Sequence, residues 1–170
     1  MELAASPLAP PGALSPLEAA SRRWAQSETS QVLLEALDCH AAGGAGGIGS
    51  FRPPAAGAPG PGGPVYEMRE YQLHPGYGSV PALRAAFAEG LPHKVAVDEW
   101  GALVGYLYTD VGVLNRVVEL WRYPGAEECM MARRAARAVP EWRACIGKVT
   151  PGVQQFETRF LQPTPLSPWQ

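Results

Sequence analysis

The sequence predicts an α+β fold of the ferredoxin-like type, with the element order β-α-β-β-α-β, between residues 65 and 170. Two segments, 65–73 and 115–123, alternate their side chains with the period of a strand. Each is followed by a segment whose apolar residues recur at helical spacing, one from Ser79 and one from Ala126. The strand-helix-strand unit therefore occurs twice, which is the pattern of this fold.

The first unit begins with the strand 65–73, which Pro75-Gly76 ends. A helix is expected from Ser79 to about Leu91, where Gly90 and Pro92 are predicted to stop it. Its apolar stripe is Val80, Leu83, Phe87 and Leu91.

The second unit begins with a hairpin of strands 102–109 and 115–123, joined by a turn at 110–112. A helix is expected from Ala126 to Val139, with carboxylates in its first turn that favour the positive end of the helix dipole. Pro140 breaks it, and 141–148 is predicted to add a short helical piece. A last strand, 153–161, completes the sheet.

The first 64 residues are predicted to lie outside this domain. Residues 1–40 form a leader, a candidate targeting segment because Arg22-Arg23 lies among Ala and Ser, although Glu2, Glu18 and Glu28 argue against it. A cleaved targeting segment and a disordered leader both remain open. Residues 41–64 contain nine Gly and five Pro among 24 residues, so we expect a disordered linker that cannot bury enough apolar surface to fold.

Composition excludes several classes of protein. Residues 65–170 contain 11 Lys and Arg and 11 Asp and Glu, so the net charge is zero and nucleic acid is not an expected partner. No apolar run approaches the ~20 residues that a membrane-spanning helix needs. The three widely spaced cysteines, Cys39, Cys129 and Cys145, fit a reduced intracellular compartment. The sequence has no nucleophile elbow, phosphate loop or metal-ligand cluster, so no cofactor, metal or catalytic residue is predicted.

The helices of such a fold cover one face of the sheet, and the other face needs water or a partner. We expect the strand face that carries Glu67, Arg69 and Tyr71 to be free of helices. The other strands then contribute Tyr106, Tyr108, Glu119, Trp121, Glu157 and Arg159 to the same face. Such a mixture of aromatic and charged side chains suits a pocket that a second copy of the sheet encloses. These residues either bind a small polar or anionic ligand or form an ion-pair network that sets strand register at a dimer interface.

Six ordered motifs resemble the NIPSNAP domain, over about residues 64–170. Residues 66–76 read YEMREYQLHPG and open the pattern. The motifs that follow are LVGY at 103–106, GVLN at 112–115, VVELWRY at 117–123, PEW at 140–142 and PTPLSP at 163–168.

The resemblance implies a homodimer of the dimeric α+β barrel type. It also implies a non-enzymatic mitochondrial binding or scaffold protein, because animal members of the family are regarded as interaction proteins in vesicle traffic and mitophagy. The alternatives are a cofactor-free or haem-handling enzyme of the dimeric α+β barrel type, a small-ligand sensor and, for localisation, the cytoplasm. Relatives usually carry His where this sequence has Glu119, so a role that depends on that imidazole does not transfer to this chain.

Overall fold

The computed structural model describes residues 31–53, 62–167 and 169. Residues 1–30, which make up most of the predicted leader, lie outside the described residues, as do 54–61 of the predicted linker. The strands are β1 (Val32–Glu35), β2 (Val65–Leu73), β3 (Ala102–Val111), β4 (Arg116–Tyr123) and β5 (Val153–Leu161). The helices are α2 (Leu37–Ala42), α3 (Ser79–Val95), α4 (Ala126–Ala138) and α5 (Pro140–Val149), with short 3-10 turns η1 (Ile48–Ser50) and η2 (Thr150–Gly152).

The five strands form one antiparallel sheet in the order β1-β3-β4-β2-β5. Strands β2 to β5 and helices α3 to α5 reproduce the predicted order along the chain, so the α+β, ferredoxin-like prediction is confirmed. The two central strands, β2 and β4, are joined in a register that sets Arg69 opposite Glu119 and Glu67 opposite Trp121. This pairing places charged residues at the centre of the sheet.

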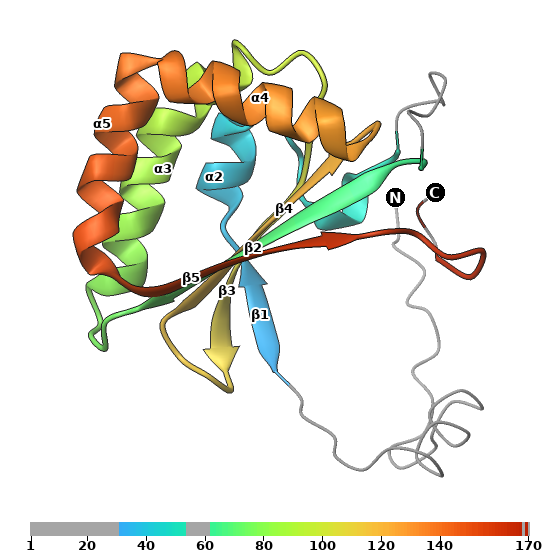
Figure 1. The fold of residues 1–170 in the computed structure, drawn as a ribbon. Helices are drawn as coiled ribbons and strands as arrows, with labels where there is room; N and C mark the ends of the chain where they lie inside the picture. Colours follow the sequence, from blue (N-terminus) through green and yellow to red (C-terminus); the bar gives the residue numbers. More distant parts are fainter. Residues whose placement is uncertain (1–30, 54–61, 168, 170) are drawn as a thin grey trace, which may run out of the picture. The chain divides into compact units, whose positions relative to one another are not determined.

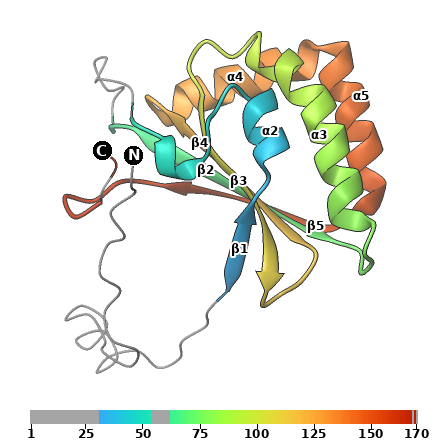
Figure 2. The same cartoon turned by 180° about the vertical axis from the view of Figure 1, so that it is seen from behind.

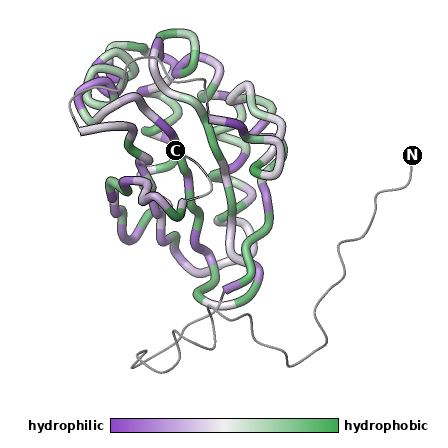
Figure 3. The backbone as a smooth tube through the Cα atoms, turned by 90° about the vertical axis from the view of Figure 1, so that its right-hand side faces the viewer, coloured by the Kyte–Doolittle hydropathy of each residue, from purple (hydrophilic) through white to green (hydrophobic). Residues whose placement is uncertain are grey.

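Helices α3, α4 and α5 lie on one side of the sheet (Figures 1 and 2). The main core fills the space between them, where the Phe87 ring contacts the rings of Tyr71, Tyr106 and Trp142 at centroid distances of 5.2–5.6 Å. Figure 3 shows hydrophobic and hydrophilic stretches interleaved along the backbone of the folded part. The opposite face of the sheet carries no α-helix in the described parts of the chain (Figures 1 and 2), and the short η1 and Phe51 pack there, beside Tyr66 and Val104.

Helix α3 does not stop at Leu91 as predicted, but continues through Pro92 to Val95. Gly90 is required for packing, because a Cβ there would lie 2.5 Å from the Cβ of Cys145 on α5. Pro92 removes one backbone N–H donor, but the helix still closes, with the Ala96 N–H donating to the Pro92 carbonyl. The extra turn carries Lys94 over the centre of the sheet.

The folded unit also begins earlier than predicted. Strand β1 pairs with β3, and α2 follows at once with Ala36, Cys39 and His40 buried. The η1 turn is followed by Phe51, which is buried beside Tyr66 and Val104. The division into a leader at 1–40 and a linker at 41–64 therefore differs from the described structure, in which residues 32–51 extend the sheet and its core. Glycine content misled the prediction, because this short segment buries a few apolar residues against a sheet that already exists.

Candidate functional site

Six of the nine predicted pocket residues meet on one face of the sheet, and it is the face that the helices cover. They are Glu67, Arg69, Tyr71, Tyr106, Glu119 and Trp121, all of them buried or nearly so. The expectation of a helix-free face was wrong for these residues. Alternation along a strand shows which side chains share a face, but the charges on the covering helices decide which face can be buried.

The Glu119 carboxylate lies at the centre of this face and is fully buried. The Tyr71 hydroxyl donates to Oε2 over 2.7 Å, and the Trp121 indole Nε1 donates to Oε1 over 2.5 Å. Burial would raise the pKa of Glu119, but Lys94 and Arg69, each 3.6 Å away, together with these hydrogen bonds, hold the pKa below its ordinary value. Glu119 is therefore an ionised carboxylate whose two oxygens are both engaged.

Lys94 reaches Glu119 from the last turn of α3. Its ammonium lies 3.1 Å from the centroid of the Trp121 ring, a cation–π contact in a site shielded from water. Burial lowers the pKa of Lys94 to about 8, and it outweighs the attraction of Glu119, which acts in the opposite direction. Near neutral pH the side chain of Lys94 can therefore be either a charged ammonium or a neutral amine.

Glu67 is the second buried carboxylate. Its Oε1 lies 3.7 Å from Nε of Arg69 and 3.4 Å from Nη1 of Arg133, which projects from α4. We call Glu67, Arg69, Lys94, Glu119 and Arg133 the Glu119 cluster. Two strands and two helices contribute to it, so its geometry depends on helix–sheet packing.

Several polar atoms of this region have no hydrogen-bond partner within the described structure. They are Nζ of Lys94, Nε of Arg69, Oε1 of Glu67 and the hydroxyl of Tyr106. Buried polar groups are normally satisfied by protein or by water. The cluster, with three cations and two carboxylates, can hold water or a small polar molecule. It is poorly suited to general acid catalysis, since its central carboxylate is held ionised. Among the described residues, no group of His, Cys, Asp and Glu is arranged to hold a metal ion.

Three predicted residues lie elsewhere. Tyr108 lies at the edge of the helix-covered face, where the Arg84 guanidinium stands 5.1 Å from its ring centroid. Glu157 and Arg159 lie on the opposite face, where Arg159 pairs with Glu157 and with Glu70. The register of β5 causes this separation, because Glu157 lies opposite Glu70 and not opposite Glu67 or Arg69. We call the helix-free side, defined by Tyr66, Glu70, Leu120, Glu157 and Arg159, the open face.

Two residues of the Glu119 cluster, Lys94 and Arg133, were not among the predicted site residues. Lys94 lies seven positions after Phe87, on the same helical stripe, but the predicted helix stopped before it. Arg133 lies on α4, four positions after the buried Cys129. A charged residue in line with an apolar stripe was the available signal in both cases.

The three cysteines are buried, and no disulfide joins them. Burial raises the pKa of Cys39 and Cys129 to about 12 and that of Cys145 to about 11. These thiols therefore stay protonated, so they are poor nucleophiles.

The comparison with known proteins rests on the segment that contains strands β2 to β5 and helices α3 to α5. The profile of the NIPSNAP family matches residues 66–168. The chain belongs to the NIPSNAP family. Strand β1, helix α2 and η1 lie before the matched residues.

Relatives in other organisms support the same assignment. The chain is 29% identical over 106 residues to Protein NipSnap of Drosophila melanogaster, covering 62% of this chain and 37% of that protein. It is 32% identical over 105 residues to mouse Protein NipSnap homolog 3B, covering 61% of this chain and 41% of the relative. The chain thus spans less than half the length of these relatives.

Solved structures agree with the fold. A NIPSNAP family protein from Agrobacterium tumefaciens superimposes with a TM-score of 0.56 at 26% identity, over 63% of this chain and 99% of that one. A NIPSNAP domain protein from Burkholderia xenovorans gives a TM-score of 0.54 at 30% identity, over 61% and 98% of the two chains. A bilayer-spanning helix, which would have to be longer and more apolar, is not found among the described helices of this chain.

Proposed function

We propose that this NIPSNAP protein is a non-enzymatic binding protein that assembles as a homodimer and serves as a mitochondrial scaffold, in the manner of vesicle-traffic or mitophagy proteins. The observation that carries the proposal is the state of Glu119, which occupies the position of the family's usual His. A carboxylate with a lowered pKa and both oxygens hydrogen-bonded is a weak proton acceptor and cannot donate a proton at neutral pH. The Glu119 cluster is therefore suited to stabilising the domain, and we assign a catalytic role to none of its residues.

The proposed dimer uses the open face. Arg116 lies 3.4 Å from Glu70, and Arg159 pairs with both Glu70 and Glu157, so opposite charges alternate across this surface. A surface of alternating charges can pair with a second copy of itself in a two-fold arrangement.

Native mass spectrometry of the full chain tests both parts of the proposal. We expect the mass of two chains with no cofactor retained, and a Glu70→Lys variant that shifts toward the monomer. Glu89→Lys is the matched control, because Glu89 pairs with Lys148 on the exposed surface of the helices. A monomeric wild-type chain, or equal effects of the two substitutions, would exclude the open-face dimer.

The enzyme alternative is tested by spectroscopy. Titration of the full chain with haem is expected to give no stoichiometric Soret shift, and a retained haem that is degraded in the presence of reductant would establish the haem-handling alternative.

Localisation is tested by fractionating cells that carry the full chain with a C-terminal tag. A purely cytosolic signal would contradict the mitochondrial part of the proposal.

A further inference from the structure

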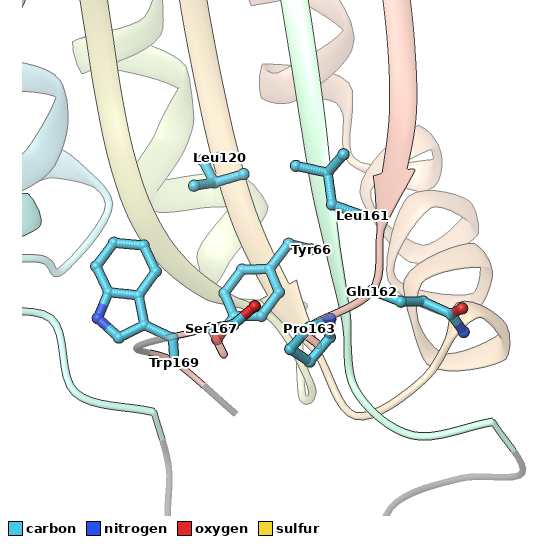
Figure 4. Close-up of a pocket in the computed structure, with 7 residues that line it drawn as sticks. All are labelled: Tyr66, Leu120, Leu161, Gln162, Pro163, Ser167 and Trp169. Carbon is cyan, nitrogen blue, oxygen red and sulfur yellow. The ribbon is translucent and has the colours of Figure 1, made fainter. Parts of the chain in front are cut away.

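The apolar end of the open face forms a recess that the proposed function does not use. Tyr66 of β2, Leu120 of β4 and Leu161 of β5 form its floor on the sheet (Figure 4). The recess has a cavity volume of about 280 Å³. The remainder of the same face is ionic, with Glu70, Arg116 and the residues that pair with them. The open face is therefore divided into a charged half and an apolar, hollowed half.

The walls of the recess come from the chain's own C-terminal tail, which we define as residues 162–167 and Trp169. After β5 the tail reverses in a turn in which the Ser167 N–H donates to the Thr164 carbonyl and the Thr164 N–H donates to the Ser167 hydroxyl, both over 2.9 Å. This turn returns Trp169 to the sheet. Pro163 and Trp169 then flank the floor residues, as Figure 4 shows.

Trp169 is held from two sides. Its ring lies nearly parallel to that of Tyr66, with centroids 6.2 Å apart, and meets the Phe51 ring edge-on at 5.2 Å. Phe51 belongs to the N-terminal segment and packs with Tyr66 and Val104 in a small second core. The recess is therefore built by a single chain from its sheet and its C-terminal tail, with Phe51 supporting Trp169, and it exists without a second copy.

The chemistry of the recess defines what it can hold. Its floor and walls are apolar and partly aromatic, and only Gln162 and Ser167 bring polar side chains to it besides the Tyr66 hydroxyl. That hydroxyl is buried beside the Arg122 guanidinium, which can only donate to its oxygen, so the hydroxyl proton has no acceptor within the described structure. Burial raises the pKa of Tyr66 despite the nearby Arg122 guanidinium, so the hydroxyl stays protonated and can donate. A cavity just under the range of ~300–1,000 Å³ typical of drug-sized ligands suits a smaller molecule.

We propose that this recess binds a small, neutral, largely apolar molecule, of the size of a naphthol and carrying one hydrogen-bond acceptor, and that Trp169 of the tail is the wall that closes on it. The acceptor meets the Tyr66 hydroxyl, and the apolar body covers Leu120 and Leu161. Leu166 of the same tail is almost fully exposed and does not line the recess. The ionic half of the open face is unsuited to such a molecule and remains for the proposed dimer.

The test is isothermal titration calorimetry of the full chain with 2-naphthol, with naphthalene as the probe that lacks the polar atom. We expect one 2-naphthol site per chain. Trp169→Ala should weaken binding by roughly tenfold, because an aromatic wall is lost. Leu161→Trp should abolish binding by filling the recess. Leu166→Ala, in the same tail but outside the recess, should leave affinity unchanged.

The polar contact has its own test. Tyr66→Phe should weaken 2-naphthol binding about fivefold, the contribution of one neutral hydrogen bond, and should leave naphthalene binding unchanged. This isosteric variant keeps the ring that supports Trp169, so it also serves if larger changes disturb the tail. Circular dichroism confirms that each variant is folded.

Three outcomes would overturn the proposal. The first is no binding of 2-naphthol to the wild-type chain at about 1 mM, the weak limit for a specific small ligand. The second is equal binding to wild type and Leu161→Trp, which would place the ligand elsewhere. The third is a Trp169→Ala chain that binds 2-naphthol normally but loses its dimer in light scattering, which would make the tail a contact between copies.

Discussion

The backbone N–H of Tyr106 donates to Nε2 of His40 over 2.8 Å, and both residues are buried. Pairing between β1 and β3 ends with Glu35 opposite Leu107. Beyond this point the His40 imidazole, in place of a further residue of β1, accepts the hydrogen bond from the Tyr106 N–H. The Ala36 N–H donates to the carbonyl of the same Tyr106 over 2.8 Å. A segment outside the family match thus satisfies the backbone of a core residue at the edge of the NIPSNAP sheet.

Removal of this segment should destabilise the domain. We expect a chain that begins at Val65 to melt at least about 5 °C below one that begins at Gln31, because β3 becomes an uncovered edge and Ala36, Cys39 and Phe51 are lost from the two cores. Differential scanning calorimetry measures the two transitions. Coincident melts would restore the view of residues 32–51 as leader and linker.

Substitution of the imidazole alone isolates one contact. His40→Ala should lower the free energy of unfolding by about 1–3 kcal/mol, because the Tyr106 N–H is left buried without a partner. Urea titration followed by circular dichroism gives the value. His74→Ala is the control, since His74 is exposed and bonds only the side chain of Gln154 through its ring. Equal losses in both variants would argue against this role of His40.

The Glu119 cluster should behave as a coupled unit. Glu119→Gln should cost about 3–5 kcal/mol of unfolding free energy, because Lys94 and Arg69 lose their shared buried counter-ion. Lys94→Met in the same chain should recover part of this loss, since it removes one of the uncompensated charges. Glu157→Gln, which alters an exposed pair with Arg159, should cost less than about 1 kcal/mol. Additive effects at Glu119 and Lys94 would disprove the coupling.

Lys94 should also give the domain a characteristic pH dependence. Its pKa is about 8 when folded against an ordinary value of 10.5, so the unfolded chain binds more protons between these values and stability rises with pH there. We expect the unfolding free energy of wild type to gain about 1 kcal/mol relative to Lys94→Met between pH 7 and 9. The difference between the two chains cancels the contribution of the three cysteines, which both share and whose raised pKa values act in the opposite direction. Parallel pH profiles would exclude a buried, titrating lysine.

The sequence by itself determined the strands and helices from residue 65 onward and the family, because alternation, helical spacing and six ordered motifs are local properties. It also placed Glu67, Arg69 and Glu119 together, since residues on one strand face and on paired strands remain neighbours. Even the break at Pro140 is found where the residues predict it. These inferences need only the period of each element and the order of the elements.

Tertiary structure decided which face of the sheet is covered and what completes the cluster. A period of two does not say which side the helices take, and the cost of burying Glu67 and Glu119 is offset by Arg69 of the sheet together with Lys94 and Arg133, which arrive from separate helices. In the same way, nothing local in residues 32–42 indicates that His40 will meet Tyr106, 66 residues further along the chain. Such pairings depend on the whole packed arrangement, because a buried charge or backbone group is stable only where distant parts of the chain supply its partner.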